Sequence, residues 1–244
     1  WIEAFGLAAH QIIGEGEATI DVEALVGLQP DLIITLTFSP DDPLEYWSLA
    51  ADGPLEQVQQ VAPIVAISGV QSSNAGVARF AELATALGMD LEAPEIVADN
   101  ERWLASEAAF RAALAEKPGI SAVFAAPSPD IIYIANPQVA GELIYYRELG
   151  LAIPDVEINP DDGDFWEYAS LEEVGKYQTD ILFSSYRGSP VEEFLAIPTV
   201  ATLPAVTAGQ VFEWFQDEIL SYRGIADTLD NMTEAVTASE IVTG

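Results

Sequence analysis

Histidine and cysteine, the residues that most often carry metal and nucleophilic chemistry, are almost absent from this chain. His10 is the single histidine, and the 244 residues include no cysteine. A zinc site made of several imidazoles or thiolates therefore cannot form, and neither can a cysteine nucleophile. A Ser-His-Asp triad would depend on His10, and no Gly-x-Ser-x-Gly turn accompanies it. We interpret His10 as a surface or loop residue.

Carboxylates are the remaining candidates for chemistry, since the chain holds forty Asp and Glu residues. Chance pairs are common among so many acids, so a glycosidase-like carboxylate pair stays open. The cluster at 161–164 (DDGD) lacks the spacing of an EF-hand loop, and we interpret it as a solvated turn. No glycine-rich phosphate-binding loop or dinucleotide fingerprint follows a predicted strand. No motif specifies a reaction, and we expect no intrinsic cofactor and no metal site.

The overall charge of the chain excludes some classes of binding partner. Eight basic residues against forty acidic ones give a formal net charge of −32. Such a surface repels nucleic acid phosphates and anionic lipid headgroups, so neither is an expected partner. Half of the residues are hydrophobic, and no apolar run approaches the ~20 residues that span a bilayer. The chain starts at Trp1 without a signal segment, and we interpret it as processed or truncated.

Short β-branched segments alternate with helical patterns, which is typical of βαβ units and parallel sheets. The predicted strands are 31–37, 64–68, 121–125, 131–135, 180–184, 199–203 and 210–214. The predicted helices are 22–28, 55–61, 76–87, 100–117, 138–149, 171–177 and 223–237. This order of elements predicts an α/β fold.

The longest predicted helix, 100–117, marks a boundary between two sheet-containing halves. It places Trp103, Phe110 and Leu114 on one stripe, with alanines between them. We predict two lobes, each a mainly parallel sheet flanked by helices, joined by this one long helix. The predicted parts are an N-terminal lobe, a connecting helix and a C-terminal lobe at 1–99, 100–118 and 119–244.

An internal sequence similarity supports the presence of two related halves. The segments 21–34 (DVEALVGLQPDLII) and 170–183 (SLEEVGKYQTDILF) align without a gap, each leading from a helix into a strand. Glu23 then falls opposite Glu172. Each segment is followed by an apolar run that starts with proline. This similarity favours a duplicated unit, although the sequence pattern that all βαβ units share could produce part of the match.

The chain resembles the periplasmic binding proteins that serve ABC importers of iron siderophores, haem and vitamin B12. No single block is specific, but five blocks occur in that family's order. They are 22–34 (VEALVGLQPDLII), 80–88 (FAELATALG), 141–151 (GELIYYRELGL), 168–173 (YASLEE) and 203–212 (LPAVTAGQVF).

The resemblance implies two α/β lobes that hold a ligand between them and catalyse no reaction. It implies an extracytoplasmic protein, free in the periplasm or a cell-surface lipoprotein, that works as a monomer with a membrane ABC permease. Members of the family usually carry a further strand and helix before the position of Trp1. The N-terminal lobe is therefore expected to lack its first part, and some ligand contacts with it.

The resemblance also implies a docking role for two acids. In the family, one acidic residue on each lobe binds arginines of the permease, and Glu23 and Glu172 fall at the matching positions. Charge-assisted bonds to arginine would let the permease recognise both lobes at once. The alternative is that both acids only complement the dipole of their helix, with Asp21 and Ser170 as caps.

Ligand-binding residues are expected in loops that follow strands. Arg187 follows the strand 180–184, and a guanidinium can donate to the iron-bound oxygens of a chelate. A surface salt bridge is the alternative for Arg187, and ordinary packing is the alternative for each aromatic candidate. Three further candidates fall at or near positions that face the ligand cleft in relatives, and they are Tyr222, Arg223 and Trp166. Two more lie in the loop after the strand 31–37, and they are Tyr46 and Trp47.

The predicted ligand is a ferric siderophore, with the hydroxamate type favoured. A strongly anionic tris-catecholate is hard to neutralise with so few basic residues, whereas a neutral or cationic ferrioxamine tolerates an acidic field. One alternative keeps the fold and changes the ligand to cobalamin or haem. Another, from a different class, is an α/β hydrolase that uses a carboxylate pair.

Overall fold

The computed structural model describes residues 20–38, 46, 55–159, 161 and 163–243, and the chain forms two compact units, 1–70 and 71–244. The helices and strands of the first unit are α1 (Val22–Leu28), β1 (Ile33–Thr37), α2 (Leu55–Val61) and β2 (Ile64–Ser68). The predicted lobe boundaries at 99/100 and 118/119 stay a prediction, and the two compact units divide at 70/71. Helix α3 (Ser73–Ala86) lies in the second unit, where it contacts α5 (Gly141–Leu149) and α8 (Tyr222–Ala238).

The first unit is a short βαβ arrangement. Asp21 begins α1 by accepting a hydrogen bond from the Ala24 N–H at 2.9 Å, as its predicted capping role requires. Strands β1 and β2 pair in parallel, from Ile33 opposite Ile64 to Thr37 opposite Ser68. The buried centre of this unit consists of Leu25, Tyr46 and Val58.

The second unit is built on one mixed five-stranded sheet. Its strands are β3 (Ala122–Pro127), β4 (Ile131–Ala135), β5 (Trp166–Ser170), β6 (Ile181–Ser185) and β7 (Val211–Trp214). They lie in the order β5-β4-β3-β6-β7. The pairs β3–β6 and β6–β7 are parallel, whereas β3–β4 and β4–β5 are antiparallel.

Both faces of this sheet are covered, so its central strands are apolar on both sides. In β6, Ile181 and Phe183 belong to the core that includes α5 and α8, and Leu182 belongs to the opposite core. The opposite core is covered by short helices, which are α6 (Val191–Leu195), α7 (Pro204–Thr207) and the 3-10 turns η3 (Val174–Lys176) and η4 (Val200–Thr202).

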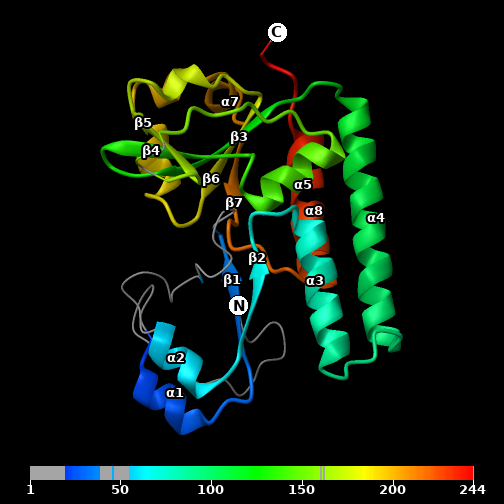
Figure 1. The fold of residues 1–244 in the computed structure, drawn as a ribbon. Helices are drawn as coiled ribbons and strands as arrows, with labels where there is room; N and C mark the ends of the chain where they lie inside the picture. The colour runs from blue at the N-terminus through cyan, green and yellow to red at the C-terminus, as the bar shows by residue number, and fades with distance from the viewer. Residues whose placement is uncertain (1–19, 39–45, 47–54, 160, 162, 244) are drawn as a thin grey trace. The chain divides into compact units, whose positions relative to one another are not determined.

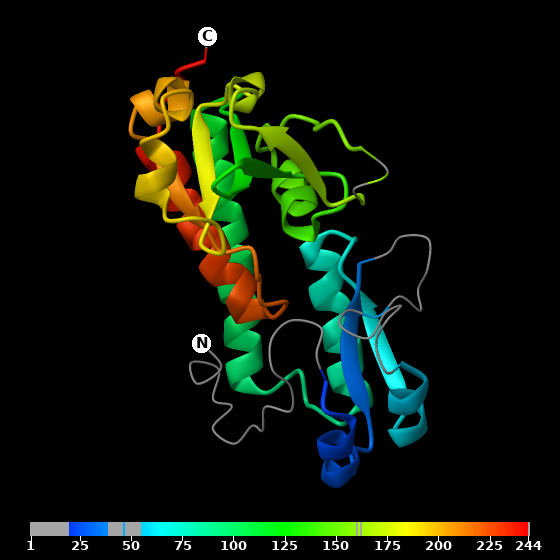
Figure 2. The ribbon, with the colours of Figure 1, turned by 90° about the vertical axis from the view of Figure 1, so that its left-hand side faces the viewer.

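The long helix α4 (Pro94–Glu116) packs along α8, as Figures 1 and 2 show. It starts earlier than the predicted Asn100, because Pro94 fits the first helical turn, where its missing N–H costs nothing. Arg102 of α4 forms ion pairs with Asp227 and Asp230 of α8, at 2.6 and 2.7 Å.

Two further predictions about elements were wrong. The segment 199–203 is not a strand, since it contains the 3-10 turn η4, and 171–177 contains η3 in place of a helix. Strand β5 was missed because the buried face of this edge strand carries Glu167. That carboxylate accepts hydrogen bonds from Lys176 and Tyr177, so a charged residue occupies a position where alternation predicts an apolar one.

Candidate ligand-binding site

Two aromatic side chains stack where the neighbouring strands β6 and β7 end. Because these strands are parallel, the loops after Ser185 and Trp214 emerge at the same edge of the sheet. Tyr186 from the first loop stacks on Phe215 from the second, with ring centroids 5.0 Å apart and planes 16° apart. Their exposed fractions are 43% and 39%, so this aromatic pair presents a ring surface to solvent.

Arg187 lies beside this aromatic pair. Its Nε is 3.1 Å from Oδ2 of Asp217, and its side chain remains 41% exposed. The Tyr186 hydroxyl donates to the same Asp217 oxygen, and Ser185 Oγ donates to Gln216. The two loops are therefore joined by polar contacts as well as by ring stacking.

The turn that carries Arg187 requires a glycine. A Cβ at Gly188 would lie 2.8 Å from the carbonyl oxygen of Pro127, which is closer than real Cβ atoms come. The backbone N–H of Arg187 donates to Ser185 Oγ at 3.1 Å, and that of Ser189 donates to the Pro127 carbonyl at 2.7 Å. The backbone at Arg187 is thus held against the end of β3.

Trp166 reaches the same region from β5. Its ring contacts Trp214, the last residue of β7, with centroids 6.0 Å apart. It also contacts Tyr133 at 6.0 Å and Phe165 at 4.8 Å. Trp166 is partly buried and belongs to an aromatic cluster that packs on the core, so its ligand role stays a prediction.

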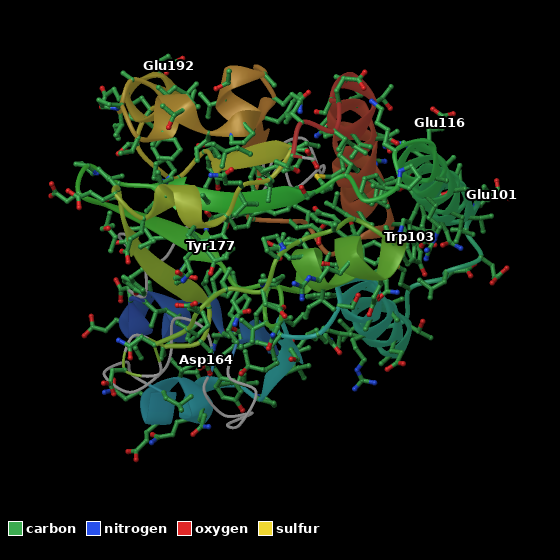
Figure 3. The ribbon with its side chains drawn as sticks, turned by 90° about the horizontal axis from the view of Figure 1, so that it is seen from above. Glu101, Trp103, Glu116, Asp164, Tyr177 and Glu192 are labelled. Atoms are coloured by element: carbon green, nitrogen blue, oxygen red, sulfur yellow. The ribbon has the colours of Figure 1, made fainter. Side chains whose placement is uncertain are left out.

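Tyr222 and Arg223 have their contacts on α4. The Tyr222 ring stacks on Trp103 at 5.6 Å, and Arg223 Nη2 lies 3.5 Å from Oδ2 of Asp99. Figure 3 shows Trp103 on α4, and its indole N–H donates to the hydroxyl of Tyr145. Packing between α4 and α8 therefore accounts for the contacts of Tyr222 and Arg223, and their ligand role stays a prediction.

The first-unit candidates are placed as follows. Tyr46 is 8% exposed and lies in the buried centre of the unit, with one bridge to Thr37. Trp47 lies outside the described residues, as does His10. A ligand role for Tyr46 and Trp47 stays a prediction.

The two predicted docking acids are both exposed. Glu23 stands in the first turn of α1, and Glu172 stands in the turn before η3. The neighbouring Glu173 accepts hydrogen bonds from the backbone N–H and the hydroxyl of Ser170, at 3.2 and 2.8 Å. Because Glu173 supplies the local cap, Glu172 is not needed for it.

Sequence reasoning missed Phe215, Asp217 and the buried acids Glu142 and Glu218. Phe215 and Asp217 follow β7 just as Arg187 follows β6, so the strand-end rule that found Arg187 would have found them. The signal for Glu142 is its spacing, since it shares a helical stripe with Tyr145, Tyr146 and Leu149, all of them buried. Glu218 gives no comparable signal.

The described part of the chain offers no metal centre. No group of three or more His, Asp or Glu side chains in it could hold an ion. None of its helices is both long enough and apolar enough to cross a bilayer. The site around Arg187 consists of two rings, hydrogen-bond donors and a carboxylate.

The chain is similar to several solved structures. A ferric-siderophore receptor protein from Streptomyces coelicolor, DesE, is 30% identical over 95% of this chain and 78% of its own, with a TM-score of 0.85. A siderophore periplasmic binding protein from the fuscachelin gene cluster of Thermobifida fusca is 22% identical over 94% and 82%, with a TM-score of 0.65. FhuD2 from Staphylococcus aureus with bound ferrioxamine B is 17% identical over 89% and 80%, with a TM-score of 0.58.

The last two likenesses show the shared two-lobed α/β fold alone. Comparison with curated proteins gave no match. The family described as periplasmic binding protein matches residues 12–218, which is most of the sequence. This match and the likeness to DesE agree with the order of elements described above, and the chain belongs to the periplasmic binding protein family.

Proposed function

We propose that this protein captures a ferric siderophore outside the cytoplasm and delivers it to an ABC permease, without catalysing a reaction. Membership of the periplasmic binding protein family implies solute binding and an extracytoplasmic location. The observation that carries the ligand class is the exposed Tyr186–Phe215 pair beside Arg187. The 30% identity to a ferric-siderophore receptor supports it.

The chemistry of these residues favours a hydroxamate chelate. Flat rings bury the apolar linkers of such a ligand, and the Arg187 guanidinium can donate to iron-bound oxygens. Asp217 already balances the charge of Arg187, and the whole chain carries −32. A neutral or cationic ferric hydroxamate meets less repulsion in this setting than an anionic tris-catecholate does.

Fluorescence titration tests the proposal. The five tryptophans of the chain should be quenched on addition of ferrioxamine B, and less by its iron-free form at the same concentration. Arg187→Gln should weaken binding about tenfold, because a charge-assisted hydrogen bond is lost. Arg79→Gln is the matched control, since Arg79 is exposed and pairs only locally with Glu82.

Other ligands give distinct outcomes in the same assay. Saturable quenching by cyanocobalamin, or a Soret band with hemin, together with no response to any ferric chelate, would replace the siderophore by one of those ligands. Turnover of a glycoside or ester library that is lost on mutating two neighbouring acids would instead support the hydrolase alternative.

The permease partnership rests on Glu23 and Glu172, which are exposed on separate units. Reversing both charges, to Arg, should abolish chelate uptake by cells and leave chelate affinity in solution unchanged. Glu116→Arg is the control, because Glu116 points outward from α4 (Figure 3). Loss of uptake with the control variant as well would contradict specific docking. We further propose that the protein works as a monomer, free or lipid-anchored.

A further inference from the structure

Two carboxylates are buried, one in the loop 215–221 and one in α5, and no positive charge among the described residues balances them. Glu142, in the first turn of α5, is 8% exposed, and its Oε1 has no hydrogen-bond partner among the described residues. Both side-chain oxygens of Glu218 are likewise buried, and within the described chain neither is in a hydrogen bond. A buried carboxylate without a counterion is costly to ionise, so such groups retain protons.

The titratable groups that interact with this pair in the described chain are two tyrosines and one acid. From α5, Glu142 is followed by Tyr145 and Tyr146, and burial together with Glu218 and Glu142 raises the pKa of Tyr146 well above its usual value. Burial raises the pKa of Glu142 to about 7, and Asp217 adds to the rise. No ion pair joins Glu142 or Glu218 to Lys or Arg in the part of the chain that the structure describes.

Glu218 is the more strongly affected partner. Burial raises its pKa to about 8, and the Glu142 carboxylate adds to the rise. Since the Glu142 carboxylate raises the pKa of Glu218, the two groups titrate together. At neutral pH this pair therefore holds at least one proton.

The position of Glu218 links this proton to the candidate ligand site. Its neighbour Asp217 binds Arg187 and Tyr186, and Phe215 stacks on Tyr186. The same loop packs on α3, since a Cβ at Gly76 would lie 3.1 Å from the Leu220 side chain. At its other end, Ser221 begins α8 by accepting from the Gly224 N–H. Glu218 therefore lies in the same loop as Asp217, which contacts Arg187, and Phe215, which contacts Tyr186.

We propose that Glu142 and Glu218 form a proton-binding pair that positions the 215–221 loop, so that losing the proton displaces Asp217 and Phe215 from Arg187 and Tyr186. When both carboxylates ionise they repel each other and require water, which the buried position does not supply. The loop then moves outward. The positioning role concerns the ligand-free protein, and only its effect on chelate affinity rests on the proposed function.

Fluorine NMR of the ligand-free protein tests the positioning role. Labelling with 5-fluorotryptophan gives one signal for each of the five tryptophans, and Trp214→Phe identifies that of Trp214, the residue just before the loop. Between pH 5.5 and 9 the Trp214 signal should shift with a midpoint near neutral pH. Glu218→Gln should abolish the shift, because an amide of the same shape cannot titrate.

A matched control separates this pair from general charge effects. Glu213→Gln removes an exposed carboxylate from β7 and should leave the shift intact. A Trp214 signal that is constant with pH in the unmutated protein would overturn the proposal. So would a shift that persists in the Glu142→Gln, Glu218→Gln double variant.

The ligand experiment is independent of that result. Ferrioxamine B affinity of the unmutated protein should fall severalfold from pH 6 to pH 9, and Glu218→Gln should flatten this dependence. Absence of chelate binding at every pH, with the Trp214 shift present, would remove the proposed ligand and retain the proton pair. Binding that is equally strong at every pH would instead contradict the coupling between the pair and Arg187.

Discussion

Arg187 is bonded to Asp217 before any ligand arrives, at a side-chain exposure of 41%. A chelate must therefore compete with an internal carboxylate for the guanidinium. Such competition favours neutral or cationic ligands, which can bind while Arg187 stays paired with Asp217. It disfavours anionic ligands, which must displace Asp217 to reach the guanidinium. At the scale of single residues, selectivity for charge thus depends on Asp217 as much as on Arg187.

Asp217→Asn should change this selectivity. Removing the carboxylate takes away a half-exposed ion pair worth ~1 kcal/mol, so the affinity for an anionic chelate relative to ferrioxamine B should rise about fivefold. Parallel titrations with ferrioxamine B and a ferric tris-catecholate measure the ratio. Glu192→Gln, an acid that points outward from α6 in Figure 3, should leave the ratio unchanged. An unchanged ratio in Asp217→Asn would show that Arg187 does not sense the ligand charge.

Asp180 is a buried residue whose ionised form is held by several hydrogen bonds. Its Oδ2 accepts from the backbone N–H and hydroxyl of Ser121, and its Oδ1 accepts from Val242 and Thr243. Burial alone would raise its pKa, but these hydrogen bonds outweigh burial and lower the pKa to about 2. A carboxylate with a lowered pKa stabilises the fold above its unfolded value near 4, and this stabilisation is lost as the pH falls from 4 to 2.

Asp180→Asn should therefore reduce the free energy of unfolding at pH 7 by ~2 kcal/mol and weaken the loss of stability between pH 4 and pH 2. Urea unfolding at a series of pH values measures both effects. The matched control is Asp31→Asn, because Asp31 holds the equivalent position in the first unit and is exposed. Equal losses in the two variants would contradict a specific role for the buried hydrogen bonds.

The helices α4 and α8 are joined at their carboxyl ends by one cation. Lys117, which follows α4, donates to the carbonyls of Val236 and Thr237 at 3.0 and 2.7 Å, and also to that of Ser239. Val236 and Thr237 lie in the last turn of α8, where carbonyls have no donor four residues further on, and Ser239 is the residue that follows the helix. The Val236 carbonyl also accepts from the Ser239 N–H at 3.3 Å. A positive charge at this end also complements the helix dipole. At the scale of elements, Lys117 both ends α8 and fixes it to α4.

Lys117→Met keeps most of the side-chain volume and removes the three donors, so the free energy of unfolding should fall by ~1–2 kcal/mol. Thermal unfolding and amide hydrogen exchange of 236–239 measure the loss and its location. Arg79→Met should change the stability by less than ~0.5 kcal/mol, because its ion pair with Glu82 is largely exposed. Unchanged exchange at 236–239 in Lys117→Met would contradict the capping role.

Local sequence patterns predicted several elements with ordinary chemistry and missed two features in which a polar residue is buried. Helix α1, helix α2 and strand β2 have their predicted bounds. In these segments the apolar periodicity and the residues that start or end an element indicate the same limits. Strand β5 and the acid Glu142 escaped prediction because each places a carboxylate on an apolar face. The loop of Arg187 was predicted from strand order, whereas its partner Asp217 depends on tertiary contact between two loops.

At the scale of the whole molecule, charge is the dominant feature. A formal charge of −32 on 244 residues sets acidic groups against one another across the surface. Folding brings these like charges closer together, so the folded state is penalised by repulsion that salt can screen. The nine described ion pairs involve seven of the eight basic residues, which leaves most acids without a cation among the described residues.

Raising NaCl from 10 mM to 0.5 M should therefore increase the melting temperature by several degrees, since the Debye length falls from about 30 Å to a few ångströms. Differential scanning calorimetry measures the change. Choline chloride at equal ionic strength should give the same increase, because screening does not depend on the identity of the cation. A rise with sodium alone would indicate a specific sodium site and contradict general screening.

The inward-facing Glu167 of β5 has a consequence for self-association. An edge strand offers unpaired backbone groups to which another copy of the chain could add a strand. Glu167 accepts from Lys176, from Tyr177 and from the backbone N–H of Glu157, so it ties neighbouring segments to the β5 edge. To extend the sheet there, a strand from another copy would have to break the hydrogen bonds that the buried Glu167 carboxylate accepts. At high concentration, this edge should keep the molecules dispersed and protect them from growing into fibres.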